Sequence, residues 1–130
     1  MKSPSVTEGI CDSASCLHAL EHFGLGRYGD PVDPRGHERG LDSLIRMLER
    51  GGILYLSEPV GPQEVLFNCH RRFHGSTVLS LVGDRMRLVR LDLVDDKGHL
   101  PTDLPHRMIT DDPTLGCRRE GCGIFEFRRS

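Results

Sequence analysis

The sequence predicts an α/β domain in which helices cover a largely parallel sheet. Strand-like apolar runs alternate with helix-like segments through the middle of the chain, which is the order of a layered α/β domain. One clear helical pattern is followed at once by Gly51-Gly52 and the apolar run 53–57, a short helix-to-strand connection. The 130 residues suit a single domain, spanning 1–130.

Each element of the first half follows from its residue pattern. The small and apolar residues 10–20 suit a buried parallel strand that passes into a short turn or helix. Glycines and prolines make 23–36 a long loop, and long loops in compact domains are often functional. Residues 36–50 form an amphipathic helix stopped by the paired glycines, because apolar side chains recur at three- and four-residue steps: Leu41, Leu44, Ile45 and Leu48.

The second half shows fewer regular patterns. We expect a short helix through Val82 with Ser76 as its N-cap, a strand at 86–94, a turn at 95–98 and a last strand at 123–128. The last strand follows its predecessor without a clear helix, which allows that pair to be antiparallel. Residues 1–9 are polar and are expected to be disordered.

Composition excludes several classes of function. A net charge of -2 gives no basic footprint for nucleic acid. No apolar run could span a bilayer, and Met1-Lys2-Ser3-Pro4 does not begin a signal peptide, so we expect a cytoplasmic protein with no membrane partner. Five cysteines, an odd number, do not suggest a disulfide framework there. Their spacing is too loose for a zinc knuckle.

The glycine pattern of residues 24–29 matches GxGxxG but does not predict a dinucleotide site. That fingerprint needs the glycines to turn from a strand directly into a helix, whose N-terminus holds the phosphates. Here Pro31 and Pro34 follow, and prolines at that spacing cannot continue a helix. We therefore interpret the segment as a glycine-rich loop.

Imidazole and carboxylate groups follow the first predicted strand. His18, Glu21 and His22 lie there, and His70 follows the next strand at 53–57. If the strands are parallel, both groups reach the edge of the sheet where ligands of open α/β folds bind. They could then act as a general base or as ligands of a divalent metal ion. The alternative is structural: a Glu-His pair capping a turn, with His70 on the surface.

Two segments resemble class I S-adenosylmethionine-dependent methyltransferases. Residues 15–22, Ser-Cys-Leu-His-Ala-Leu-Glu-His, are similar to their fourth strand and its Glu-His pair. Residues 48–59 look like the "LxxGGxLxxSxP" fifth strand, with Glu49-Arg50 in place of the usual Lys-Pro.

A closer resemblance covers 11–127. It is to a methyltransferase-like domain of unknown function found in nematodes, algae and bacteria, and it is carried by 17–31, Phe67-Asn68 with His70-Arg71, and 122–127.

The resemblance implies a partial Rossmann-like sheet with flanking helices, the C-terminal half of a methyltransferase fold without its N-terminal cofactor-binding half. It implies S-adenosylmethionine as the cofactor, which we expect this chain not to bind fully on its own. The implied catalytic residues are Glu21, His22 and His70, the substrate-binding residues His18, Arg27, Tyr28, Asp30 and Asn68, and the cofactor contacts Cys16 and Leu17.

Three functions stay open on the sequence. The first is a methyltransferase-related domain acting on an unidentified small-molecule or macromolecular methyl acceptor. The second is a non-catalytic binding or interaction module derived from one. The third is a metal-dependent site at Glu21, His22 and His70, which is the least expected because it rests on analogy. The sheet edge left by the missing half would favour self-association.

Overall fold

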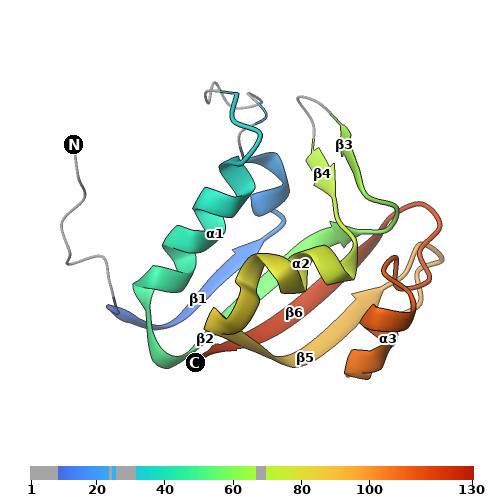
Figure 1. The fold of residues 1–130 in the computed structure, drawn as a ribbon. Helices are drawn as coiled ribbons and strands as arrows, with labels where there is room; N and C mark the ends of the chain where they lie inside the picture. Colours follow the sequence, from blue (N-terminus) through green and yellow to red (C-terminus); the bar gives the residue numbers. More distant parts are fainter. Residues whose placement is uncertain (1–8, 24, 26–31, 67–69) are drawn as a thin grey trace.

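A four-stranded mixed sheet with helices packed against it forms the centre of the structure (Figure 1). The computed structural model describes residues 9–23, 25, 32–66 and 70–130. The elements in chain order are β1 (Cys11–Leu17), η2 (Leu20–His22), α1 (Gly36–Met47), β2 (Leu48–Val60), β3 (Glu64–Leu66), β4 (His70–Arg72), α2 (Gly75–Val82), η3 (Gly83–Arg85), β5 (Met86–Val94), α3 (His106–Asp111) and β6 (Gly121–Arg129).

The strands of the sheet lie in the order β1, β2, β6, β5. β1 and β2 are parallel, whereas β6 is antiparallel to both β2 and β5. The α/β class and the antiparallel pairing of the last two strands of this sheet agree with the sequence. The prediction of a largely parallel sheet is wrong: β6 returns between two strands of the same direction, so just one neighbouring pair is parallel.

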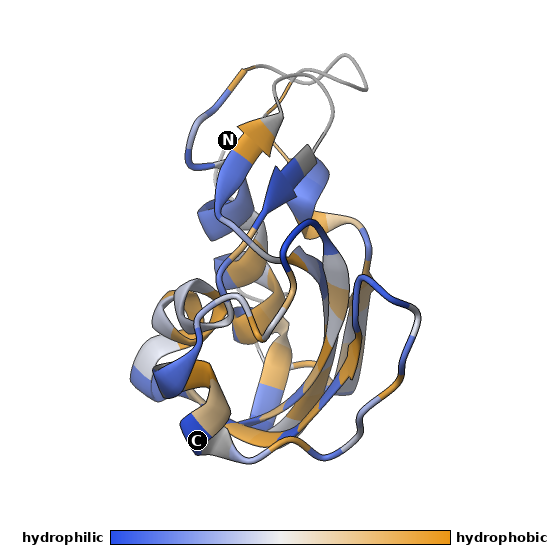
Figure 2. Cartoon of the chain, turned by 90° about the vertical axis from the view of Figure 1, so that its right-hand side faces the viewer, coloured by the Kyte–Doolittle hydropathy of each residue, from blue (hydrophilic) through white to orange (hydrophobic). Residues whose placement is uncertain are grey.

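The helices form one layer on one face of the sheet. α2 packs against both α1 and α3, and Figure 2 shows the helices to one side of the strands. The aromatic rings of Phe125 and Phe127 on β6 are fully buried beneath this layer, as are Leu54 and Leu56 on β2. Tyr55 lies between those two leucines and is 42% exposed, so no described helix covers the opposite face there.

The paired glycines lie inside a strand and not at a helix end. α1 ends at Met47 rather than at Arg50, and β2 begins at the next residue. The pairing of β1 with β2 is irregular at this point, since Cys11 lies opposite Leu48 while Ser13 lies opposite Ile53. Gly51 has a φ of 79°, and a Cβ on Gly52 would lie 2.8 Å from a backbone oxygen. The glycines therefore accommodate a strand irregularity.

Other boundaries agree with the sequence to different degrees. β5 has the predicted limits, and η2 is the short helix expected after β1. The N-cap of α2 is His74 rather than Ser76. The β3–β4 hairpin and α3 were not predicted, because such short elements carry too little periodicity. Residues 1–8 lie outside the described part, so most of the expected disorder over 1–9 is untested.

The two edges of the sheet differ. A loop segment pairs with the outer side of β5: the amides of Leu93 and Leu104 form backbone hydrogen bonds with Pro101 and Leu91 at 3.0 and 2.8 Å. At the other edge, no described strand pairs with the outer side of β1. Unpaired edges are sites of association between chains, and self-association through β1 stays a prediction.

Membrane insertion gains no support from the described helices. None of them combines the length and the apolar content needed to cross a bilayer.

Two neighbouring residues of β2 test the one-sided packing. Leu54 is fully buried under the helices, whereas Tyr55 points to the opposite face. We expect Leu54→Ala to lower the free energy of unfolding by about 2–5 kcal/mol, through lost burial and the cavity left behind. Tyr55→Ala should cost roughly 1 kcal/mol or less. Urea denaturation measures both values. Equal losses would show that a further layer covers Tyr55.

Candidate functional site

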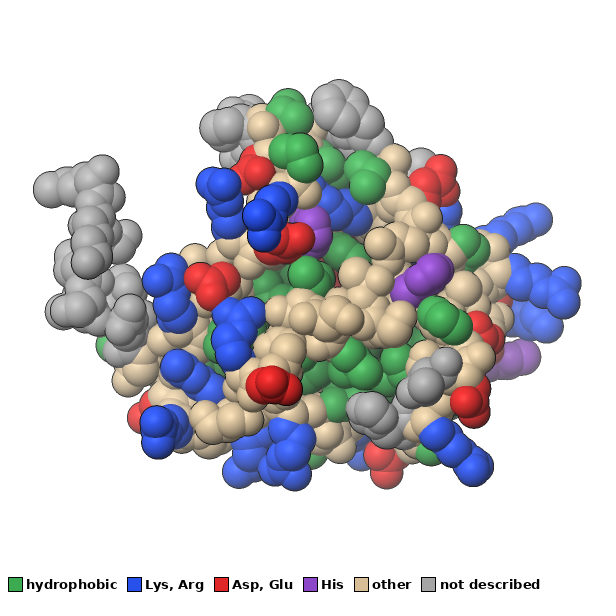
Figure 3. All heavy atoms as spheres, viewed as in Figure 1, with side chains coloured by type: hydrophobic (Ala, Val, Ile, Leu, Met, Phe, Trp, Pro, Cys, Tyr) green, Lys and Arg blue, Asp and Glu red, His purple; other side chains and the backbone are tan. Residues whose placement is uncertain are grey.

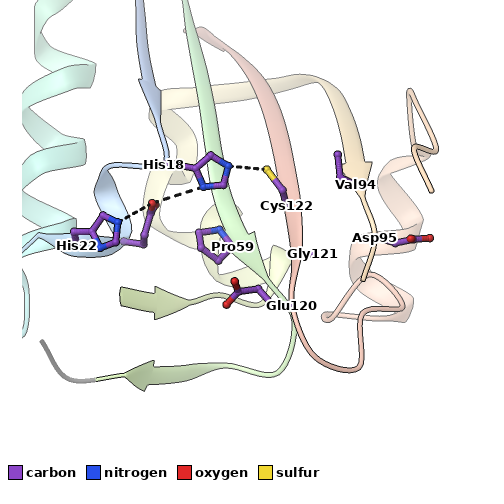
Figure 4. A pocket seen from close by; sticks show the side chains of 9 residues that line it. His18, His22, Pro59, Val94, Asp95, Glu120, Gly121 and Cys122 are labelled. Atoms are coloured by element: carbon purple, nitrogen blue, oxygen red, sulfur yellow. Dashed lines mark hydrogen bonds and ion pairs between the residues drawn. The ribbon is translucent and has the colours of Figure 1, made fainter. Parts of the chain in front are cut away.

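A pocket of about 390 Å³ opens at the edge where β1, β2 and β5 end and β6 begins (Figure 4). Ligands of open α/β sheets bind at this edge, beyond the carboxyl ends of the strands. Segments far apart in the sequence therefore share one wall, which is lined by His18, Glu21, His22, Pro59, Val94, Asp95, Glu120, Gly121 and Cys122.

His18 projects from the end of β1 over the pocket. Its φ of 53° is uncommon for a residue other than glycine. Its backbone amide donates to both the carbonyl oxygen and the Oγ of Ser57, each at 3.1 Å, which holds this conformation. The ring then lies with Nε2 3.1 Å from Sγ of Cys122 and Nδ1 3.8 Å from Oε1 of Glu21. One imidazole thus joins a thiol to a carboxyl group.

Glu21 is the buried acid of the pocket. It lies in η2 and is 1% exposed, and its Oε1 atom is shared by two imidazoles, since Nε2 of His22 lies 3.5 Å away (Figure 4). Its other oxygen, Oε2, is buried and has no hydrogen-bond partner among the described residues. A buried acceptor without a partner is costly, so Oε2 needs a donor such as a protonated carboxyl group.

Glu58 places a second carboxyl group beside Glu21. It lies near the end of β2 and is fully buried, and no described donor reaches either of its oxygens. Burial, the hydrogen bond with the Glu21 carboxyl and the negative charge of Glu21 raise the pKa of Glu58 to about 11. Glu58 is therefore protonated at neutral pH and gains a partner by donating its proton to Glu21.

Two cysteines border the carboxyl groups. Cys16 on β1 is buried, while Cys122 on β6 is partly exposed. Burial raises the pKa of both thiols, and the charge of Glu21 raises the pKa of each further. Both side chains are thus thiols rather than thiolates at neutral pH.

A buried arginine holds the ends of the glycine-rich loop. Arg71 on β4 is 4% exposed, and its guanidinium donates to the carbonyl oxygen of Phe23 on one side of the loop. On the other side it donates to the carbonyl oxygens of Asp33 and Pro34, at 3.3 and 3.5 Å. The β3–β4 hairpin therefore ties η2, which carries Glu21, to the segment before α1.

The structure brings together three of the residues predicted for the site: His18, Glu21 and His22. Cys16 and Leu17 lie on opposite faces of β1, with Leu17 59% exposed. His70 belongs to β4, but its side chain is outside the described part. Four further predicted residues also lie outside it, so their roles stay predictions: Arg27, Tyr28, Asp30 and Asn68. Residues 24–29, which match GxGxxG, also lie outside the described part, with the exception of Leu25.

Sequence reasoning missed Glu58 and Cys122. The predicted strand ended at Ser57, which assigned Glu58 to a loop, but β2 continues to Val60. An acid directly after an apolar run was the available signal for a buried carboxyl group. No local signal pointed to Cys122, because β6 becomes the neighbour of β2 through sheet order alone.

Two observations bear on a metal ion and on a cofactor. The described residues contain no group of three or more His, Cys, Asp or Glu side chains placed to hold a metal ion. β1 leads into the three-residue helix η2, and not into the glycine-rich turn and long helix that would hold a nucleotide. Cys16 and Leu17 point to different faces of β1, so the two predicted cofactor contacts do not share one face. Binding of S-adenosylmethionine stays a prediction.

Comparison with known families identifies the chain. It belongs to the family described as Caenorhabditis protein of unknown function, DUF268, whose model matches residues 6–109. The match includes His18, Glu21 and Glu58 and ends before β6. No curated protein shows significant similarity to the chain.

The protonated state of Glu58 gives a pH-dependent stability. Its pKa is raised from 4.5 to about 11 on folding, so the folded chain binds more protons than the unfolded chain between these values. Stability therefore falls as pH rises through this window, by at most about 1.4 kcal/mol per pH unit. Glu58→Gln keeps the shape without the titration, and its stability relative to wild type should rise from about pH 5 to pH 8.

Urea denaturation at several pH values measures this difference. Glu49→Gln on the exposed part of β2 is the matched control and should follow the wild-type pH dependence. A constant difference between Glu58→Gln and wild type across this range would show that Glu58 is ionised in the folded protein.

Proposed function

We propose that this member of the DUF268 family is a methyltransferase-related domain whose described part binds the methyl acceptor, with Glu21 as the general base. The observation that carries the proposal is the place of the Glu21 carboxyl group: it lines the pocket, and its Oε1 atom faces two imidazoles. An acceptor hydroxyl or amine in the pocket would donate a hydrogen bond to this carboxyl group.

The fold supports this proposal in two ways. β1 and β2 are neighbouring parallel strands with α1 between them in the chain, the unit from which Rossmann-like sheets are built. These strands overlap the two segments, 15–22 and 48–59, that resemble consecutive strands of class I methyltransferases. The pocket also lies at the carboxyl ends of these strands, where such sheets bind their ligands.

The neighbouring groups suit Glu21 for proton transfer. Glu58 is protonated at neutral pH, so a negative charge on Glu21 does not face a second one. His18 and His22 flank Oε1 and can pass on a proton that Glu21 accepts. S-adenosylmethionine would supply the methyl group when bound. We assign no step to the described residues beyond binding the acceptor and taking its proton.

A non-catalytic binding module of the same ancestry is the second candidate. It is favoured by the placement of Cys16 and Leu17 on different faces of β1 and by the unpaired outer side of that strand among the described residues. Such a module would keep the acceptor pocket and bind ligand without transferring a methyl group.

Release of S-adenosylhomocysteine separates the two candidates. The protein is incubated with a high concentration of S-adenosylmethionine and a protein-free small-molecule extract of cells, and the product is measured by mass spectrometry. We expect product that depends on the extract and falls by about 10²–10⁴-fold in Glu21→Gln, because the general base is lost. Glu49→Gln serves as the control.

No product from the wild type above the protein-free blank would reject methyl transfer by this chain. Equal product from Glu21→Gln and wild type would reject Glu21 as the base.

A further inference from the structure

Cys122 and His18 are in direct contact although 104 residues separate them in the sequence. Sγ of Cys122 lies 3.1 Å from Nε2 of His18, and Nδ1 on the other side of the ring faces Oε1 of Glu21 at 3.8 Å. This is the order of groups in a nucleophilic triad: a nucleophile, a base that takes its proton, and an acid that orients the base. Figure 4 shows the imidazole of His18 and the thiol of Cys122 joined by a dashed line at the pocket.

We propose that Cys122, His18 and Glu21 form an acyl-accepting site, in which the thiol attacks an activated carbonyl carbon such as that of a thioester. This activity is separate from the methyl transfer proposed above and needs no methyl donor. It shares the pocket and Glu21 with that function, whereas Cys122 has no role in it.

The partners of the imidazole select its tautomer. Nδ1 faces Oε1 of Glu21 at 3.8 Å, so the tautomer with its hydrogen on Nδ1 directs that hydrogen toward the carboxyl group. The lone pair of Nε2 then faces the thiol, which donates to it. Burial raises the pKa of the Cys122 thiol, so the proton is still on sulfur before attack, and a neighbouring base is needed to remove it.

Regular structure holds the nucleophile and the base in place. Cys122 belongs to β6 and pairs with Pro59 on β2 and Val94 on β5, so both neighbouring strands fix its position. The amide of His18 is bound twice to Ser57, which holds the left-handed backbone conformation that points the ring over the pocket. Strain of this kind at a non-glycine residue is typical of functional sites.

The pair is accessible to a substrate. The His18 side chain is 55% exposed, Cys122 is partly exposed, and both line the pocket. Of the other described cysteines, Cys16 and Cys117 are buried, and Cys11 is partly exposed like Cys122. Cys11 lies at the start of β1, at the opposite end of that strand from His18, which makes it an internal control for reactivity.

The transfer step balances without a further reactant. The Cys122 proton moves to Nε2 of His18 as the sulfur–carbon bond forms, and Glu21 stabilises the resulting imidazolium. The tetrahedral intermediate then collapses, and the bond between the carbonyl carbon and the leaving sulfur or oxygen breaks. The leaving group takes the proton from His18. The products are acyl-Cys122 and a free thiol or alcohol, and His18 returns to its neutral form.

Acetylation by p-nitrophenyl acetate tests the proposal. The rate of p-nitrophenol release is followed by absorbance, and peptide mass spectrometry gives the acetylation rate of each cysteine. We expect Cys122 to react at least about 10-fold faster than Cys11 at pH 7, since general-base catalysis supplies factors of about 10²–10⁴. His18→Gln should lower the Cys122 rate at least about 10-fold and leave the Cys11 rate unchanged.

Matched variants separate catalysis from structure. His74→Gln makes the same substitution outside the pocket and should leave both cysteine rates unchanged. Cys122→Ser should remove the fast part of the p-nitrophenol release, which we assign to Cys122.

Two results would overturn the proposal. The first is a wild-type Cys122 that is acetylated no faster than Cys11, and this comparison decides the matter even if His18→Gln does not fold. The second is a folded His18→Gln protein in which Cys122 keeps its wild-type rate. Because neither measurement uses S-adenosylmethionine, failure here is distinguishable from failure of methyl transfer.

Discussion

The parallel register between β1 and β2 is the constraint on which the site depends. Leu17 lies opposite Ser57, and the amide of His18 continues the pairing by bonding to Ser57. A slip of one residue would turn each side chain of β1 to the other face of the sheet. With the observed register, η2 starts close enough to the end of β2 for Glu21 to meet Glu58 in the protein interior. The pocket and its acid pair follow from that alignment.

Burying the carboxyl groups of Glu21 and Glu58 lowers the free energy of unfolding, and packing elsewhere must offset this loss. Two carboxyl groups are taken out of water, and no described hydrogen bond other than the one between them reaches three of their four oxygens. An apolar residue at position 58 would avoid this cost, and the buried positions of β2 are otherwise apolar apart from Gly52 and Ser57. Stability given up at one point while the rest of the fold obeys the packing rules is characteristic of a site kept for its chemistry.

Local patterns in the sequence predicted what local physics determines. The apolar stripe of α1 and the limits of β5 could be predicted because side-chain periodicity fixes them. Glu21 and His22 could be proposed because residues after a buried strand reach the ligand edge. Cys122 could not, since its contact with His18 needs β6 to insert beside β2. The prediction that Gly51-Gly52 end the helix was wrong, because a helix end and a strand irregularity both favour glycine.

The hydrogen bonds that Arg71 donates to both ends of the glycine-rich loop affect how the segment between them can vary within the family. One guanidinium binds carbonyl oxygens at both ends of the segment between Phe23 and Asp33, so the anchor points are backbone atoms. Their recognition is indifferent to side-chain identity, and closing a longer segment costs only a term that grows with the logarithm of its length. The length of the segment between the anchors can therefore vary while η2, and with it Glu21, keeps its position.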